Sequence, residues 1–319
     1  MKLIIQIPCH NEEAQLPETL GDLPREVDGF DTVEWLIIDD GSTDRTVEVA
    51  REHGADHVLS LGHNHGLAAA FMAGIERALR LGADVIVNTD GDNQYRADCI
   101  PALCRPILEG RAQIAVGARP IAAIAHFSPL KRFLQKLGSR VVRLASGADV
   151  EDAPSGFRAI HRNAAARLYV FNRWTYTLET IIQAGQLRIP TVSVPIEVNP
   201  PTRPSRLFRS TAQYVLRSAF TILRIATVYR PARTFGVLGA LTMLPGLAAF
   251  ARFLVYALGG DPEGKLQSLV IGSGLIAAGA AVIVGGMLAD LVAANRMLLS
   301  EIRARQLLAD IERERGREG

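Results

Sequence analysis

The sequence predicts an α/β protein, a mostly parallel sheet covered by helices, that continues into two apolar helices. In the first 200 residues, short apolar runs rich in β-branched residues alternate with segments of helical spacing, which is typical of a parallel sheet. The later stretches 235–258 and 266–289 are each longer than the roughly 20 apolar residues that span a bilayer. Between the two parts, Pro200, Pro201 and Pro204 interrupt regular structure.

The predicted elements succeed one another in a regular order. Apolar runs predict strands at 3–7, 33–38, 57–61, 85–88 and 114–117. Helices are expected at 43–53, 66–81 and 98–108, with Ser42 or Thr43 as a cap and with Gly54 and Gly82 as stops. A basic helix at 129–145, a strand at 157–160, a helix at 176–184 and an edge strand with two prolines at 189–198 complete this part.

The region beyond residue 200 is predicted to lie at and in a membrane. No Asp or Glu occurs from 198 to 260, whereas eight arginines do. Segment 207–229 predicts an interfacial helix with snorkelling arginines, and an ordinary surface helix is the alternative. The runs 235–258 and 266–289 are predicted spans, with the buried helices of a soluble protein as the alternative. Arginines before the first run and after the second predict that both ends are cytoplasmic.

Two further expectations concern the second apolar run and the C-terminal tail. The glycines of the run permit close helix packing and association into a homo-oligomer: Gly272, Gly274, Gly279, Gly285 and Gly286. The charged tail 300–319 is expected to be a solvated helix that frays.

The overall composition argues against several other classes of protein. A net charge of +2 gives no indication of nucleic-acid binding. Three unpatterned cysteines argue against a disulfide framework and a zinc site, and they suit a reducing cytoplasm. The N-terminal run is too short for a signal sequence, so the sheet domain is expected to stay in the cytoplasm.

The most informative motif is the pair Asp90 and Asp92, directly after the predicted strand 85–88. Ligands of open α/β sheets gather at the ends of such strands. Two carboxylates one residue apart suit Mg²⁺ or Mn²⁺ that holds a diphosphate, and an Asp-rich turn is the alternative.

Three other loops carry polar groups to the same predicted edge of the sheet. They come after the strands 3–7 and 33–38 or begin the helix 66–81, and they contain Asn11, Glu12, Asp40 and Gly66. These groups suit a nucleoside and its phosphates, and ordinary helix starts and capped turns are the alternative.

Six motifs in order resemble a family 2 glycosyltransferase of GT-A fold. They are IPCHNEE (7–13), IIDDGSTD (37–44), NHGL (64–67), DGDNQ (90–94), VGAR (116–119) and SGFRA (155–159). The chain is most similar to the polyprenyl-phosphate sugar transferases with two C-terminal spans. The resemblance implies a GT-A domain at 1–205, basic juxtamembrane helices at 206–233, a two-helix membrane domain at 234–296 and a charged cytoplasmic tail at 297–319.

The resemblance also implies a role for each matching residue. Pro8, Asn11, Glu12, Asp40 and Gly66 would bind the nucleotide, and Asp90, Asp92 and Gln94 would hold the metal and the diphosphate. The acceptor phosphate would meet four arginines: Arg119, Arg132, Arg203 and Arg206. Asp152 would face the sugar and, with Asp92 and Arg119, form the catalytic set.

The implied reaction moves a hexose from a UDP- or GDP-linked donor to dolichyl or undecaprenyl phosphate, with inversion, at the cytoplasmic face of the membrane. A lipid phosphate is already anionic, so it needs alignment and charge screening more than deprotonation. The alternatives are a processive or other-acceptor family 2 enzyme and a non-catalytic membrane scaffold. The processive enzymes carry Gln-x-x-Arg-Trp, whereas Val170 stands where this chain would need the Gln.

Overall fold

The computed structural model describes residues 1–120, 150–170, 176–200, 224, 227–259 and 266–318. The chain forms two compact units, of which one holds residues 1–218 and 300–319 and the other holds residues 219–299. The expected basic helix 129–145 and most of the expected interfacial helix 207–229 lie outside the described residues.

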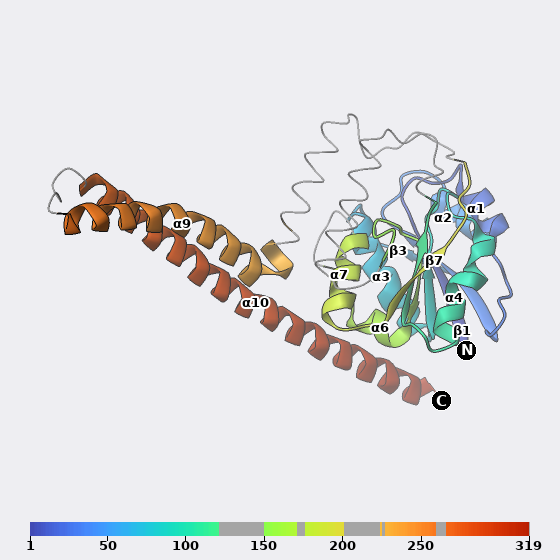
Figure 1. Ribbon diagram of the computed structural model, residues 1–319. Helices are drawn as coiled ribbons and strands as arrows, with labels where there is room; N and C mark the ends of the chain where they lie inside the picture. Colours follow the sequence, from blue (N-terminus) through green and yellow to red (C-terminus); the bar gives the residue numbers. More distant parts are fainter. Residues whose placement is uncertain (121–149, 171–175, 201–223, 225–226, 260–265, 319) are drawn as a thin grey trace. The chain divides into compact units, whose positions relative to one another are not determined.

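The first unit contains one sheet with helices around it (Figure 1). The described strands have the order β3-β2-β1-β4-β6-β5-β7. Four neighbouring pairs are parallel, and β6 alone runs antiparallel, between β4 and β5. The prediction of a mostly parallel sheet is therefore confirmed, and so is the edge position of β7. The strands are β1 (Lys2–Cys9), β2 (Thr32–Asp39), β3 (His57–Ser60), β4 (Val85–Asn88), β5 (Ile114–Ala118), β6 (Arg158–His161) and β7 (Thr191–Pro195).

Helices cover both faces of the sheet, as the buried strands require. Leu3, Ile5 and Ile7 of β1 belong to the core that α1, α2 and α4 share. The alternate residue Gln6 faces α3, where its Nε2 lies 3.4 Å from the carbonyl oxygen of Phe71. The helices are α1 (Leu16–Asp22), α2 (Thr46–Glu52), α3 (Leu67–Arg80), η1 (Ala97–Cys99), α4 (Ile100–Leu108), α6 (Arg162–Arg167) and α7 (Thr177–Gln186).

The order of the strands places a switch point between β1 and β4. The chain proceeds from β1 outward to β2 and β3, and then returns to the other side of β1 as β4. In the parallel register, Cys9 lies beside Asp39 and Gln6 beside Asn88. The loops after these three strands therefore begin at one edge of the sheet, where open α/β sheets bind their ligands.

The second unit is a pair of helices long and apolar enough to cross a membrane, α9 (Pro231–Leu258) and the first part of α10 (Leu266–Glu318). Many of their large apolar side chains are exposed, such as Val255 and Leu258. The helices meet through glycines spaced seven residues apart: Gly239 and Gly246 on α9, and Gly272, Gly279 and Gly286 on α10. Of the five glycines expected to allow close packing, Gly274 and Gly285 instead face open space.

The expectation of a helix in the tail 300–319 is confirmed for the described residues, but the expectation that this helix is solvated and frays is wrong. Helix α10 continues without a break to Glu318, and Ala304, Leu307 and Ile311 are buried. Their spacing of three and four residues places them on one helical face within a strongly charged sequence. Ion pairs accompany this face within the first unit: Arg80–Glu314 (2.7 Å), Arg167–Glu301 (3.1 Å) and Arg303–Glu76 (3.2 Å).

The glycine contacts between α9 and α10 generate a first prediction. A Cβ atom at Gly279 would lie 2.7 Å from the carbonyl oxygen of Gly239, so Gly279→Leu should force the helices apart and cost about 1–3 kcal/mol. Gly274→Leu is the matched control, because nothing lies within 4 Å of a Cβ there. The midpoint temperature at which helix content is lost in detergent, measured by circular dichroism, should fall for Gly279→Leu alone. Equal melting of both variants would contradict the described packing.

Candidate active site

The loops after β1, β2 and β4 contact one another directly at the carboxyl edge of the sheet. The Asn11 Oδ1 atom accepts a hydrogen bond from the backbone N–H of Thr43 (2.8 Å). The backbone N–H of Glu12 donates to Thr46 Oγ1 (2.9 Å). A Cβ atom at Gly91 would lie 3.2 Å from Cys9 Sγ. The structure thus brings together three of the four predicted loops, those after β1, β2 and β4.

Asp40 is buried, and it fixes the start of α3. Its two carboxylate oxygens accept hydrogen bonds from the backbone N–H groups of His65 (2.7 Å) and Gly66 (2.9 Å). Gly66 is the N-cap residue of α3, with a φ of 93° that favours glycine. Asp40 and Gly66 therefore have a structural role at the start of a helix. The hydrogen bonds that provide it join the loop after β2 to the loop before α3.

The residues at the end of β1 are held by their neighbours. Pro8 is buried within the sheet, and Asn11 has a left-handed φ of 57°. The backbone carbonyl of Glu12 accepts the N–H of Leu16, which opens α1 (2.9 Å). The alternative role of Asn11 and Glu12, that of a helix start, is thus present. The helix that follows, α1, was not among the predicted elements.

Asp90 and Asp92 form an electrostatically crowded pair at the end of β4. Burial and the negative charge of Asp92 raise the pKa of Asp90 to about 7, while Arg119 acts in the opposite direction. The backbone of Gly156 lies against Asp90, because a Cβ atom there would be 3.2 Å from Asp90 Oδ1. Gln94 lies further along the same loop, and its backbone N–H donates to Asp92 Oδ1 (3.2 Å).

Arg119 and Asp152 are partners of each other. Arg119 donates from Nε to Asp152 Oδ2 (2.6 Å) and from Nη2 to Asp152 Oδ1 (3.1 Å). The Asp152 side chain is fully buried, and that of Arg119 is 16% exposed. Although burial opposes the charge of Arg119, its bonds to Asp152 raise its pKa above the ordinary value. Asp152 is therefore placed to orient Arg119.

A buried polar network behind Asp90 was not foreseen from the sequence. Asn88 Nδ2 donates to the Gly156 carbonyl and to Tyr176 Oη (both 2.9 Å), and the Gly156 N–H donates to Tyr95 Oη (3.0 Å). The signal was a polar residue inside an apolar strand: Asn88 in β4 and Gln6 in β1, which bond each other at 2.9 Å. This network fixes the segment that faces Asp90.

Arg158 is the other group that sequence reasoning left without a role. Its guanidinium is fully buried, and it donates to the backbone carbonyls of Ser155, Ala153 and Thr177 at 2.8–2.9 Å. Burial lowers the pKa of Arg158 to about 10. The Arg158 cation therefore ties the loop before β6 to the start of α7.

The carboxylates at this edge fit a divalent cation that takes its remaining ligands from outside the protein. Among the described residues, no group of three or more His, Cys, Asp or Glu side chains surrounds one point. Mg²⁺ commonly uses one or two carboxylates, with phosphate oxygens and water for the rest. Asp90 and Asp92 meet that requirement, and a cation would also relieve the repulsion between them.

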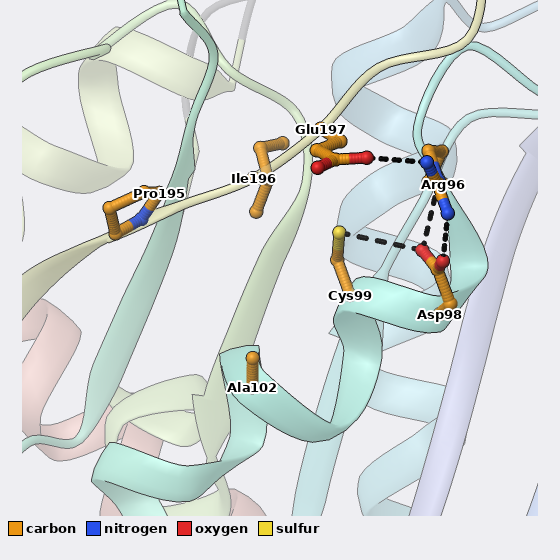
Figure 2. Close-up of a pocket in the computed structure, with 7 residues that line it drawn as sticks. All are labelled: Arg96, Asp98, Cys99, Ala102, Pro195, Ile196 and Glu197. Carbon is orange, nitrogen blue, oxygen red and sulfur yellow. Dashed lines mark hydrogen bonds and ion pairs between the residues drawn. The ribbon is translucent and has the colours of Figure 1, made fainter.

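A hollow of about 420 Å³ lies elsewhere on the first unit, and none of the predicted site residues lines it. Figure 2 shows its charged side chains turned toward one another, with Arg96 paired to Asp98 and Glu197. We assign no role to the hollow. Arg132, Arg203 and Arg206 lie outside the described residues.

The chain is similar to proteins of a known family. Residues 4–168 match the family model described as glycosyl transferase family 2. An undecaprenyl-phosphate mannosyltransferase from Micrococcus luteus is 30% identical over 50% of this chain and 66% of its own length. A UDP-N-acetylglucosamine–dolichyl-phosphate N-acetylglucosaminyltransferase from Methanococcus voltae is 29% identical over 60% of this chain and 83% of its own length.

The solved structures confirm the fold. Glucosyl-3-phosphoglycerate synthase from Mycobacterium tuberculosis, in complex with Mn²⁺, UDP and glucosyl-3-phosphoglycerate, aligns with a TM-score of 0.54. The alignment covers 71% of this chain and 78% of that one, at 17% identity. The expectation of a GT-A fold is confirmed.

The buried pair of Arg119 and Asp152 generates a second prediction. Asp152→Asn removes the charge that balances a mostly buried guanidinium, so it should lower the free energy of unfolding by about 3 kcal/mol. The matched control is Glu109→Gln, which breaks the exposed pair with Arg111 and should change little. Thermal unfolding monitored by tryptophan fluorescence measures both variants. Equal unfolding midpoints would show that Asp152 does not hold Arg119.

Proposed function

The chain belongs to glycosyl transferase family 2, and we propose that it transfers a hexose from a nucleotide-sugar to polyprenyl phosphate. One observation supports this proposal most strongly. The same chain contains the family's domain and two helices that are long and apolar enough to cross a membrane. An acceptor anchored in the bilayer suits such a chain. The names of the relatives from Micrococcus luteus and Methanococcus voltae, which include polyprenyl acceptors, support the same choice.

On the donor side, Asp90, Asp92 and Gln94 would hold Mg²⁺ or Mn²⁺. When bound, the cation neutralises the diphosphate and so makes the nucleoside diphosphate a better leaving group. The raised pKa of Asp90 supports this assignment, since burial and the neighbouring charge of Asp92 outweigh the opposing effect of Arg119. Pro8, Asn11, Glu12, Asp40 and Gly66 lie around the loops that would receive the UDP- or GDP-linked nucleoside.

On the acceptor side, Arg119 would meet the lipid phosphate, assisted by Arg132, Arg203 and Arg206. Asp152 keeps the Arg119 guanidinium in one orientation through two hydrogen bonds. A phosphate oxygen attacks the anomeric carbon while the bond from that carbon to the diphosphate breaks, which inverts the configuration. No proton has to be removed from the anionic acceptor, so alignment and charge screening supply most of the catalysis.

The arrangement in the membrane is part of the same proposal. Both apolar helices would span the inner membrane, with the domain 1–205 and the C-terminal end in the cytoplasm. The positive-inside rule supports this sidedness, because Arg230, Arg233 and Arg296 flank the apolar runs on the proposed cytoplasmic side.

The proposal predicts a labelled lipid product that depends on Asp92. Full-length protein in detergent, with undecaprenyl phosphate, Mn²⁺ or Mg²⁺ and a panel of radiolabelled UDP- and GDP-sugars, should give label that partitions into organic solvent. Asp92→Ala should reduce the rate by about 100-fold or more, because the developing charge on the leaving group is no longer balanced. The matched control Asp98→Ala removes an exposed acid six residues further on, and it should keep the rate.

Two results would contradict the proposal. Absence of labelled lipid with every donor, from folded wild-type protein, would exclude a polyprenyl phosphate acceptor and favour another acceptor or a scaffold. Equal rates for wild type and Asp92→Ala would exclude the assigned site.

A further inference from the structure

The segment immediately after β7 lies against the loop that carries Asp90 and Asp92, although about 100 residues separate them in sequence. The backbone N–H of Ile196 donates to the carbonyl of Ala118, which precedes Arg119 (3.1 Å). Val198 forms an isolated antiparallel bridge with Tyr95. Figure 2 shows Glu197 of this segment directed toward Arg96, with which it forms an ion pair.

Asn199, at the end of this segment, holds two consecutive backbone carbonyls of the loop. Its backbone N–H donates to the carbonyl of Gln94 (2.9 Å). Its side-chain Nδ2 donates to the carbonyl of Asn93 (2.8 Å). Asn93 is itself in a left-handed conformation, with a φ of 54°, and its side chain is tied to Asp22 of α1 (2.9 Å). The turn after Asp92 is therefore fastened from two sides.

One peptide unit links Asn199 to the carboxylate of Asp92. The peptide between residues 93 and 94 presents its C=O to Asn199 Nδ2 and its N–H to Asp92 Oδ1, the latter at 3.2 Å. Because a peptide is planar, fixing the direction of the C=O fixes the direction of the N–H. A donor at the carbonyl also polarises the peptide and strengthens the bond that its N–H makes. The amide of Asn199 is thus linked to the carboxylate of Asp92 through a single peptide unit.

We propose that Asn199 is a positioning residue for Asp92, acting through the peptide between residues 93 and 94. This inference rests on the proposed role of Asp92 in holding a divalent cation. Groups that orient a metal-binding carboxylate change metal affinity by about 10–100-fold when they are removed. Asn199 would therefore set the affinity of the site for its cation while making no contact with the cation itself.

The test measures Mn²⁺ binding to full-length protein in detergent, from the electron paramagnetic resonance signal of free Mn²⁺, with and without UDP or GDP. Asn199→Ala and Asn199→Leu both remove the side-chain donor, but Leu keeps the number and the branching of the side-chain heavy atoms of Asn. Both variants should bind Mn²⁺ about tenfold or more weakly, and Asn199→Gln, which retains an amide, should recover part of the affinity. Glu197→Gln, in the same segment, should bind like wild type.

Each other outcome has a definite meaning. If Asn199→Leu binds Mn²⁺ like wild type and Asn199→Ala does not, Asn199 serves packing, and the inference is overturned. Equal Mn²⁺ affinity in all variants also overturns it. If wild type binds no Mn²⁺ under any condition, the metal role of Asp92 in the proposed function fails, and this inference fails with it. Thermal unfolding without Mn²⁺ should be alike for wild type and Asn199→Leu, which separates lost affinity from lost folding.

Discussion

The burial of Asp90 beside the negative charge of Asp92 is the constraint on which the candidate site depends. Burial and the negative charge of Asp92 disfavour the ionisation of Asp90, and they raise its pKa to about 7. Nearby arginines partly offset this unfavourable environment of Asp90, while the two acids stay close together. Arg119, held by Asp152, and the buried Arg158 both act to lower the pKa of Asp90. A site that keeps this unfavourable pair together is suited to a cation as its ligand.

Parallel strand pairing explains why the pair has neighbours of the right kind. Because β2, β1 and β4 run in the same direction, the loops after them begin at one edge. The loops after β1 and β2 are joined by backbone N–H groups that donate to side-chain oxygens. Asp40 bonds the first turn of α3, and Asn199 bonds the turn after Asp92. Acidic side chains thus lie among loops that cannot easily move apart. Such preorganisation favours a charged ligand, because little has to be rearranged when the ligand binds.

Local patterns predicted the strands and the strand-end loops, but contacts between distant residues were not visible in them. The apolar runs at 3–7 and 85–88 and the acids that follow them could be recognised from the local sequence alone. The pairing of Arg119 with Asp152 joins residues 33 positions apart, and that of Asn199 with Asn93 joins residues 106 apart, so no periodicity reveals either. Helix α1 has only seven residues, too few for its helical spacing to be recognised from the sequence. The buried face of the tail was missed because Ala304, Leu307 and Ile311 are outnumbered by charges.

The most direct test of this account is the pH dependence of Mn²⁺ binding to the full-length chain, for wild type and for Asp92→Asn. Cation binding requires an ionised Asp90, so below its pKa of about 7 a proton competes and the affinity should fall about tenfold per pH unit. Above that pH the affinity should level off. Asp92→Asn should bind weakly throughout and should shift the fall to lower pH, because the repelling charge is gone. Affinity that is independent of pH, or unchanged by Asp92→Asn, would contradict the claim that these two carboxylates share one cation.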